Sequence, residues 1–227
     1  MTNPRADAVH LHEVIEGSVG GGITEAVNVL KARPNADRQL IKRQYRTQFK
    51  SELLDDAVKA FKGQDEVLNG LLNLPEDYDA KELYNSMKGM GTKEATLTEI
   101  ICSRDCAELK QAAYSYRHWY GRSLDEDVES ETSGDYRTIL LALLKCKREH
   151  GTVADAGRAR KTAETLADKK DDEETFVTVL TEQSFPQIMA VAAEYAAVAG
   201  KTFEEGVKKK FGGDAETAAL ALCEFKL

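Results

Sequence analysis

Residues 87–104, MKGMGTKEATLTEIICSR, and residues 123–137, SLDEDVESETSGDYR, decide the fold of this chain. Around them apolar side chains recur at helical spacing, and turn-forming residues stand between the recurrences. The apolar positions are Leu97, Ile100, Ile101, Leu109, Ala112, Ala113, Tyr116, Tyr120, Ile139, Leu140, Leu143 and Leu144. With turns at Gly121 and at residues 132–134, this pattern predicts five short helices, over about 78–88, 93–102, 106–120, 124–129 and 135–145.

The same pattern occurs twice more along the chain. A backward shift of 71 residues aligns Tyr45, Phe49, Leu53, Asp56 and Gly63 with Tyr116, Tyr120, Leu124, Asp127 and Gly134. A forward shift of 79 residues aligns Leu180, Tyr195, Gly200, Phe203 and Gly213 with Ile101, Tyr116, Gly121, Leu124 and Gly134. A helical pattern with a period of about 70 to 80 residues indicates stacked helical repeats. We predict boundaries between repeats near Pro75 and within residues 150–156.

The composition favours helices and argues against several classes of protein. Hydrophobic residues make up 42% of the 227 residues, and only 4 residues are proline. The formal net charge of −8 argues against nucleic-acid binding, because phosphate backbones require a basic surface. It also predicts repulsion from an acidic membrane unless a cation intervenes. We find no apolar run long enough to span a bilayer, and the N-terminus lacks the basic-then-apolar order of a signal peptide.

The cysteines suggest a reducing compartment. They are Cys102, Cys106, Cys146 and Cys223. Cys102 and Cys106 have the spacing of neighbours on one helical face, but no second pair completes a zinc site. We interpret all four as small apolar residues of the core, which predicts a cytoplasmic protein.

A loop in the middle copy has the composition of a calcium site. The loop MKGMGT at residues 87–92 joins two predicted helices, and its glycines allow the backbone to bend so that carbonyl oxygens converge. Calcium prefers about six to eight oxygen ligands that combine carbonyls with carboxylates. Glycine turns are usually only turns, so the loop alone does not establish a metal site. Glu131, in the stretch SETSG at residues 130–134, adds a carboxylate and changes that interpretation.

These stretches resemble a known family. YDAKEL at residues 78–83, followed by the two stretches quoted first, resembles the second repeat of an annexin. NADRQLIKRQY at residues 35–45 resembles the first repeat, and SFPQIMAVAAEY at residues 184–195 resembles the third. The resemblance covers nearly the whole chain after about residue 10. It implies an all-α fold of right-handed superhelical five-helix repeats, in three copies.

The resemblance also divides the chain. We expect a short N-terminal tail over residues 1–12, a first repeat over 13–74, a second repeat with the calcium site over 75–147, and a third over 148–227. Annexins have a fourth repeat, which is absent from this sequence, so the first repeat is expected to expose an apolar face. We expect that face to bind a second copy of the chain or a protein partner.

The annexin pattern assigns calcium ligands residue by residue. In the family, carbonyl oxygens of the glycine loop and a carboxylate from a later helix junction hold the ion. The matching positions are the carbonyls of Met87, Gly89 and Gly91 and the carboxylate of Glu131.

The resemblance implies two further features beside this site. A weaker calcium site of the family matches the Thr92 carbonyl and Glu94, although Lys93 departs from the family's pattern there. Asp79 and Arg104 match an ion pair that lines a polar channel in annexins. We interpret this pair as structural here.

The other two copies depart from the calcium pattern. The first has SVGG at residues 18–21 in place of the loop and Ala60 in place of the acid. The third has DKKD at residues 168–171 and Lys210 at the acid position, where an ammonium group would compete with a metal. One calcium site is therefore expected, with a higher calcium requirement than several loops acting together.

The predicted function is calcium-dependent binding to acidic phospholipid membranes, by a cytoplasmic protein that becomes peripheral at membranes when calcium rises. The alternative is a calcium-independent scaffold or cytoskeleton-associated protein that has kept the fold. Because no nucleophile, acid–base pair or phosphate-binding motif was found, we expect no enzymatic activity.

Overall fold

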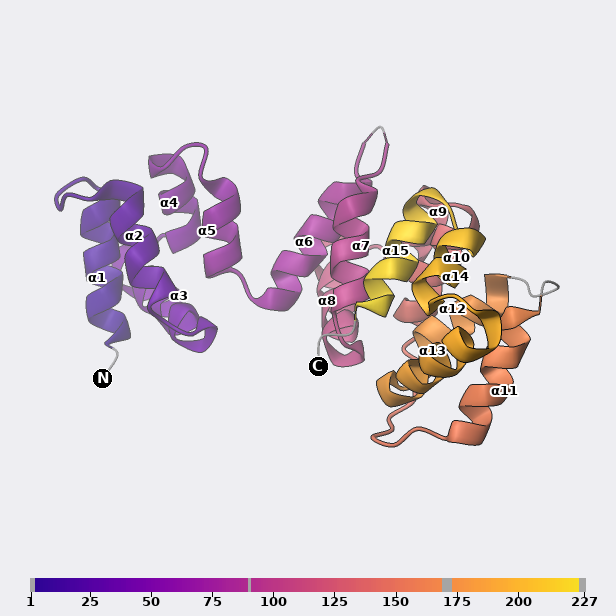
Figure 1. Ribbon diagram of the computed structural model, residues 1–227. Helices are drawn as coiled ribbons and strands as arrows, with labels where there is room; N and C mark the ends of the chain where they lie inside the picture. Colours follow the sequence, from indigo (N-terminus) through magenta and orange to yellow (C-terminus); the bar gives the residue numbers. More distant parts are fainter. Residues whose placement is uncertain (1–2, 90, 169–172, 225–227) are drawn as a thin grey trace. The chain divides into compact units, whose positions relative to one another are not determined.

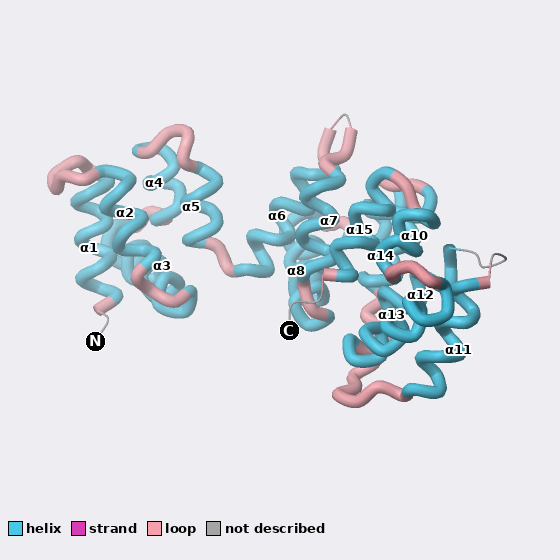
Figure 2. The backbone as a smooth tube through the Cα atoms, in the orientation of Figure 1, coloured by secondary structure: helices cyan, strands magenta, loops and turns pink. Residues whose placement is uncertain are grey.

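The computed structural model describes residues 3–89, 91–168 and 173–224, and within them it contains helices and turns but no strand (Figures 1 and 2). The fifteen helices of the described residues are α1 Pro4–Ile15, α2 Gly22–Lys31, α3 Asn35–Phe49, α4 Leu53–Ala60, α5 Asp65–Leu72, α6 Pro75–Met87, α7 Glu94–Ser103, α8 Cys106–Tyr120, α9 Leu124–Glu131, α10 Gly134–Leu144, α11 Ala156–Ala167, α12 Glu173–Glu182, α13 Phe185–Ala199, α14 Phe203–Lys210 and α15 Gly213–Cys223. Taken five at a time, they confirm the predicted all-α fold of three five-helix repeats.

Helices α6 to α10 lie close to their predicted positions. Helix α8 has the predicted bounds, and α7 differs by one residue at each end. Helix α6 begins earlier than predicted, at Pro75, because proline is well suited to the first position of a helix. Helix α9 extends to Glu131, so this predicted ligand is the last helical residue.

The prediction that residues 1–12 form a short tail is wrong. Residues 4–15 form α1, whose N-terminus is capped by the side chain of Asn3. Ala8, Leu11 and Val14 recur at helical spacing, and each is at most 2% exposed. Helix α1 therefore buries its apolar side and is the first helix of the first repeat.

The cysteines are also placed differently from the prediction. Cys102 lies near the end of α7 and Cys106 is the first residue of α8, so the two do not share a helical face. Between them Arg104 has an extended backbone, with φ −84° and ψ 145°, which separates the two helices. All four cysteines are partly exposed rather than fully buried.

The chain divides into two compact units, residues 1–78 and residues 79–227. The first unit contains α1 to α5. Its helices are held by one buried cluster, formed by Ala8, Leu11, Val14, Ala26, Leu30, Ile41, Tyr45, Leu53 and Leu72. Each of these helices is too short to be stable alone, so burial of this cluster supplies most of their stability.

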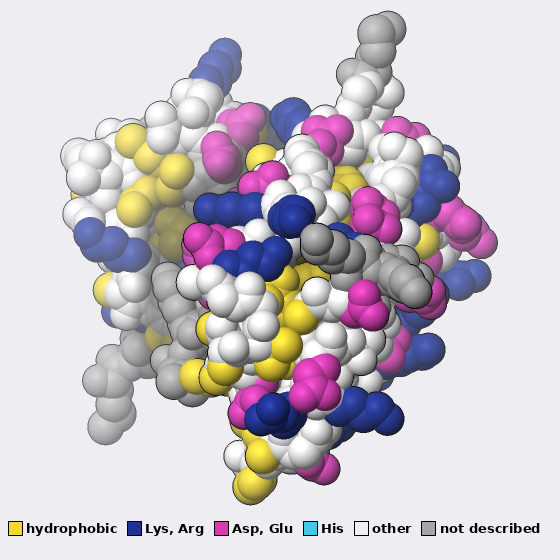
Figure 3. All heavy atoms as spheres, turned by 45° about the vertical axis from the view of Figure 1, so that its right-hand side comes forward, with side chains coloured by type: hydrophobic (Ala, Val, Ile, Leu, Met, Phe, Trp, Pro, Cys, Tyr) yellow, Lys and Arg dark blue, Asp and Glu magenta, His cyan; other side chains and the backbone are white. Residues whose placement is uncertain are grey.

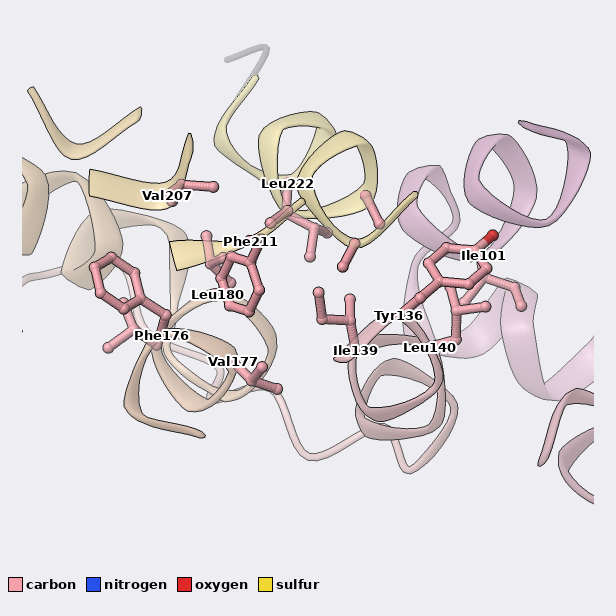
Figure 4. Packing of buried hydrophobic residues seen from close by; sticks show 14 of the residues in the cluster. Ile101, Tyr136, Ile139, Leu140, Phe176, Val177, Leu180, Val207, Phe211 and Leu222 are labelled. Atoms are coloured by element: carbon pink, nitrogen blue, oxygen red, sulfur yellow. The ribbon is translucent and has the colours of Figure 1, made fainter. Parts of the chain in front are cut away.

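In the second unit the second and third repeats share one core. Helices α7 and α10 pack against α12 and α15. Figure 4 shows the apolar side chains that meet there, among them Ile101, Tyr136, Ile139, Leu140, Phe176, Val177, Leu180, Val207, Phe211 and Leu222. Burying one such side chain contributes about 1.5–3 kcal/mol, so this cluster joins the two repeats strongly.

The surface combines both signs of charge with apolar residues. Figure 3 shows one face, on which acidic and basic side chains are interspersed and hydrophobic side chains gather between them. Over the whole sequence, 39 acidic residues outnumber 31 basic ones. In the part of the chain that the structure describes, no helix is long and apolar enough to cross a membrane.

A buried tyrosine holds the fourth helix in each of the first two repeats. The Tyr45 hydroxyl donates to Asp56 at 3.0 Å, and the Tyr116 hydroxyl donates to Asp127 at 2.6 Å. Arg122 also donates to Asp127, from Nε to Oδ2 at 2.7 Å. These bonds fix α4 against α3 and α9 against α8.

In the third repeat the fourth helix is held by close packing on a tyrosine rather than by a tyrosine–aspartate hydrogen bond. Gly206 stands at the position of Asp127, and the ring of Tyr195 lies directly against it. A Cβ added at Gly206 would lie only 2.6 Å from the Tyr195 hydroxyl oxygen. Close packing therefore replaces the tyrosine–aspartate hydrogen bond in this repeat.

We predict that Asp127→Asn destabilises the protein at neutral pH by about 1–3 kcal/mol. The hydrogen bonds from Arg122, and then that from Tyr116, lower the pKa of Asp127, while its burial opposes them. A carboxyl whose pKa is lowered by folding stabilises the protein above its unfolded pKa of about 3.9, and this stabilisation is lost as pH falls through the folded value.

Urea denaturation of variant and parent at several pH values tests this prediction. The difference in stability is expected to be large at pH 7 and to shrink below about pH 4. Asp125→Asn, an exposed change on the same helix, is the matched control and is expected to have little effect. A difference that stays constant down to pH 2 would contradict the prediction.

Candidate metal centre

The loop after α6 has a backbone that requires glycine. Helix α6 ends at Met87, whose carbonyl oxygen therefore lacks an intrahelical partner. Gly89 and Gly91 have φ values of +105° and +89°, a conformation that other residues rarely adopt. A Cβ at either glycine would meet no atom within 4 Å, so the backbone rather than lack of space requires glycine. Met90 of the same loop lies outside the described residues.

One hydrogen bond closes the loop and another joins it to Glu131. The Lys93 amide donates to the Ser86 carbonyl at 2.8 Å, which brings the end of the loop back to α6. The Thr92 hydroxyl donates to the carbonyl of Glu131 at 3.1 Å. Glu131 is exposed at the end of α9, and the bond spans 39 residues of sequence. The structure thus places the backbone of Glu131 beside Thr92, at the end of the predicted loop.

Two residues in the first turn of α10 hold the start of α7 and the residue after Glu131 in place. The Tyr136 hydroxyl donates to the Glu94 carbonyl at 2.8 Å and lies 2.9 Å from the Thr98 hydroxyl. Arg137 donates from Nε to the Thr132 carbonyl at 2.7 Å. These bonds join α10 to the first turn of α7 and order the residue that follows Glu131.

The residues of the predicted weaker site lie at the start of α7. Thr92 precedes this helix and is partly buried, while Glu94 is its first residue. The Glu94 carbonyl accepts a hydrogen bond from the Tyr136 hydroxyl. The Glu94 carboxylate is therefore the group that this residue would offer to a metal ion. Lys93 lies between them and is exposed.

Asp79 and Arg104 form a two-pronged ion pair. Arg104 donates from its Nε and a terminal nitrogen to the two carboxylate oxygens at 2.7 and 3.0 Å. The hydrogen bond with Asp79 raises the pKa of the arginine. Arg33 and Asp7 make the same pair, with the same two distances, in the first repeat. Each pair joins the first helix of its repeat to the end of the second helix.

The acid position can be compared directly among the three repeats. Ala60, Glu131 and Lys210 are each the last residue of an eight-residue helix. After Glu131 and Lys210 the backbone is nearly the same: two extended residues, then a glycine with φ of +57° or +59°. After Ala60 the turn is longer, because α5 begins only at Asp65. The loop predicted at residues 168–171 of the third repeat lies, after Asp168, outside the described residues.

The donor atoms at this site suit a hard cation. Carbonyl and carboxylate oxygens are the ligands that Ca²⁺ prefers, and softer metals favour sulfur or imidazole. Within residues 3–89, 91–168 and 173–224, no three His, Cys, Asp or Glu side chains gather as metal ligands. A site made mainly of backbone carbonyls is consistent with that result.

Sequence reasoning missed the residues that assemble the site. The hydroxyls of Thr92 and Tyr136 make the bonds between elements, yet neither was assigned this role. Their partners lie about 40 residues away in sequence, which no local pattern reveals. Tyr116 and Asp127 did carry a signal, because both recur in the first copy as Tyr45 and Asp56.

Comparison with known proteins identifies the family. The family model described as annexin matches residues 78–143 and 159–222, more than half of the chain. The chain belongs to the annexin family. Mouse annexin A3 is 36% identical to this annexin over 226 residues, which are 97% of this chain and 70% of that protein.

Solved structures agree with this assignment. A variant of annexin A8 with an intact N-terminus has a TM-score of 0.90 and 32% identity, over 99% of this annexin and 72% of that chain. Calcium-bound annexin (Sm)1 has a TM-score of 0.83 and 27% identity, over 97% of this annexin and 68% of that chain. The resemblance stated from the sequence is thereby confirmed.

We predict that Tyr136→Phe destabilises this annexin by about 1–3 kcal/mol, because it leaves the buried Thr98 hydroxyl and the Glu94 carbonyl without their partner. Chemical denaturation measures the change. Tyr114→Phe is the matched control, because Tyr114 is 76% exposed and its ring lies largely in solvent. Equal stability of the two variants would show that the Tyr136 hydroxyl contributes nothing.

Proposed function

We propose that this annexin binds acidic phospholipid membranes in a calcium-dependent manner through the loop at residues 87–92 and Glu131. The observation that carries the proposal is the hydrogen bond from the Thr92 hydroxyl to the Glu131 carbonyl, which keeps the backbone of Glu131 beside the end of the loop. Membership of the annexin family supports membrane binding in general. The similar annexin (Sm)1 is described as calcium-bound, which supports calcium as the ion.

The proposed ligands leave room for a lipid. The carbonyls of Met87, Gly89 and Gly91 with a two-oxygen contact from Glu131 would give about five of the six to eight oxygens that calcium takes. A lipid phosphoryl oxygen or water would complete the set. Bound calcium supplies the positive charge that an acidic chain lacks for contact with acidic headgroups. The Thr92 carbonyl and Glu94 remain a weaker second site in this proposal.

One full site rather than three is proposed. Ala60 offers no oxygen from its side chain, and Lys210 brings a positive charge to the position of Glu131. Several calcium loops on one molecule strengthen each other's membrane binding, and a protein with one loop lacks this gain. This annexin should therefore require more calcium for the same membrane binding than a protein with several loops. Lys210 and its neighbours Lys208 and Lys209 would face acidic headgroups without calcium, at about 1 kcal/mol per charge near the surface.

The boundaries of the repeats are also part of the proposal, with residues 4–15 now assigned to helix α1 rather than to a tail. We infer a second repeat over residues 75–147 and a third over residues 148–227. The family-model matches over residues 78–143 and 159–222 lie within these two ranges, which supports them. The first repeat then begins with α1. We also propose that the protein is cytoplasmic, becomes peripheral at membranes when calcium rises, and acts by binding rather than catalysis.

A second candidate function is a calcium-independent scaffold that has kept the fold. The observation in its favour is the loss of the acid in two of three repeats, at Ala60 and Lys210. Under this candidate, the site at Glu131 would have no effect on membrane binding.

Vesicle sedimentation separates the two candidates. We expect the parent to sediment with phosphatidylserine-containing vesicles only when calcium is present. Glu131→Gln removes a charged ligand, and we expect it to raise the calcium concentration for half-maximal binding by roughly tenfold or more, a loss of about 1.4 kcal/mol. Glu129→Gln is the matched control, since Glu129 is exposed on the same helix but lies two residues before Glu131.

The outcomes of this experiment are distinct. Sedimentation that is equal with and without calcium, in the parent and in both variants, would exclude the proposed function and favour the scaffold. An equal loss in Glu129→Gln would show that general surface charge, rather than a specific ligand, controls binding.

Self-association through the first repeat is also proposed. Val67 on α5 and Leu74 after it are large apolar residues that are 45% and 38% exposed. Such exposed apolar side chains favour contact with a second copy. Light scattering is expected to show a mass that rises with concentration in the parent and falls toward the monomer in Val67→Asp. Val153→Asp is the control, because Val153 lies in the second unit and is 83% exposed, and this variant is expected to behave as the parent. A parent that stays monomeric at every concentration would contradict self-association through the first repeat.

A further inference from the structure

Two cysteines that are 40 residues apart in sequence lie side by side in the second repeat. Cys106 is the first residue of α8, and Cys146 follows the last turn of α10. The Cys146 thiol donates to the Cys106 carbonyl at 3.5 Å, and the Cys106 sulfur lies 4.0 Å from the Cys146 carbonyl. Each sulfur therefore reaches across to the backbone of the other residue.

Each sulfur lies within 4.0 Å of the backbone carbonyl oxygen of the other cysteine. Burial, and then a hydrogen bond from one thiol to the other, raises the pKa of Cys146 to about 12. A disulfide requires two Cα atoms within about 7 Å and sulfurs that can approach to about 2 Å, and the contact of each sulfur with the other residue's backbone is compatible with that geometry. Both residues are partly exposed, so a small oxidant can reach them.

The backbone at Cys146 is unusual. Its φ is +53°, and among the described residues other than glycine only Lys50 also has a positive φ. Glycine or asparagine would adopt this conformation at lower cost. A cysteine at this position is therefore not explained by the turn itself, whereas a role for its sulfur would explain it.

The other two cysteines lack such a partner sulfur. The Cys223 thiol donates to the carbonyl of Ala219 on its own helix, at 3.3 Å. Burial raises the pKa of Cys102 to about 12, and this residue packs against the shared core. Cys102 and Cys223 both pack against the shared core, as the sequence predicted, although neither is fully buried.

We propose that Cys106 and Cys146 form a reversible disulfide when this annexin meets a peroxide. The Cys106 thiol loses its proton to solvent, and the thiolate attacks one peroxide oxygen and breaks the O–O bond. The departing hydroxide takes up a proton, which gives a sulfenic acid and one water. The Cys146 thiol then attacks the Cys106 sulfur, the S–O bond breaks, and a second water leaves. In sum, two thiols and one hydrogen peroxide give one disulfide and two waters, and a dithiol reverses the change.

The order of the two steps follows from the environment of Cys146. The Cys146 thiol donates to the Cys106 carbonyl at 3.5 Å, a contact that holds it in its protonated form, whereas the Cys106 sulfur lies farther, at 4.0 Å, from the Cys146 carbonyl. Cys146 is therefore the resolving residue and Cys106 is the residue that meets the peroxide first.

The disulfide would tie the start of α8 to the end of α10 and enclose α9 between them. The glycine that begins α10, three residues after Glu131 in sequence, is at the opposite end of that eleven-residue helix, about 16 Å away along its axis. The cross-link would thus stabilise the second repeat without touching the proposed calcium ligands.

Thiol counting on the full-length protein tests the proposal. After brief treatment with limited hydrogen peroxide, we expect two of the four thiols to be lost and a tryptic peptide containing Cys106 to be linked to one containing Cys146. Dithiothreitol should restore both thiols. Cys102→Ser is the matched control and should leave the linked peptide unchanged.

Single variants test the order and the geometry. In Cys146→Ser the sulfenic acid at Cys106 is expected to persist and to be labelled by dimedone, whereas Cys106→Ser should give at least tenfold less label at Cys146. The oxidised parent should melt several degrees higher than the reduced protein, and neither variant should show this shift. Faster loss of Cys102 or Cys223, a cross-link only between molecules, or oxidation without a change in melting temperature would overturn the proposal.

Discussion

The described helices of this annexin have between 8 and 15 residues, and a helix of that length is marginal in water by itself. Each helix therefore depends on the apolar side that it buries against others. In the first unit, five helices share one buried cluster. In the second, α7 and α10 pack against α12 and α15, so two repeats share one core. Packing between helices is the constraint on which everything else in the structure depends.

The candidate calcium site is a consequence of this packing. The glycine loop at residues 87–92 and Glu131 belong to different parts of the repeat, and neither element holds the other locally. They meet because α6, α7, α9 and α10 surround common apolar residues, and the bonds made by Thr92 and Tyr136 then fix the detail. A site of backbone carbonyls requires this support, because a carbonyl is positioned only by the course of the chain itself.

The three repeats show how chemistry changes while the fold is kept. Glu131 and Lys210 end matching helices, and the backbone after them is nearly identical. The helix and the turn depend on buried neighbours such as Leu124 and Phe203. The last residue of the helix, exposed at Glu131 and partly exposed at Lys210, is not part of that buried core. A carboxylate, a methyl group or an ammonium group can therefore occupy this position without disturbing the core. The tyrosine–aspartate bond was likewise replaced in the third repeat, where Tyr195 packs on Gly206.

The sequence by itself determined the helical fold, its three copies and the family, because apolar spacing and recurring motifs are local properties of the chain. The sequence also identified the glycine loop and predicted Glu131 as a calcium ligand, but its prediction of a tail at residues 1–12 was wrong because α1 lies there. Only the tertiary structure decided that Thr92 meets Glu131, that Tyr136 holds the start of α7, and that Cys106 lies beside Cys146 rather than paired with Cys102. Each of those contacts joins residues about 40 positions apart. Such contacts result from the packing of whole helices, which local spacing does not encode.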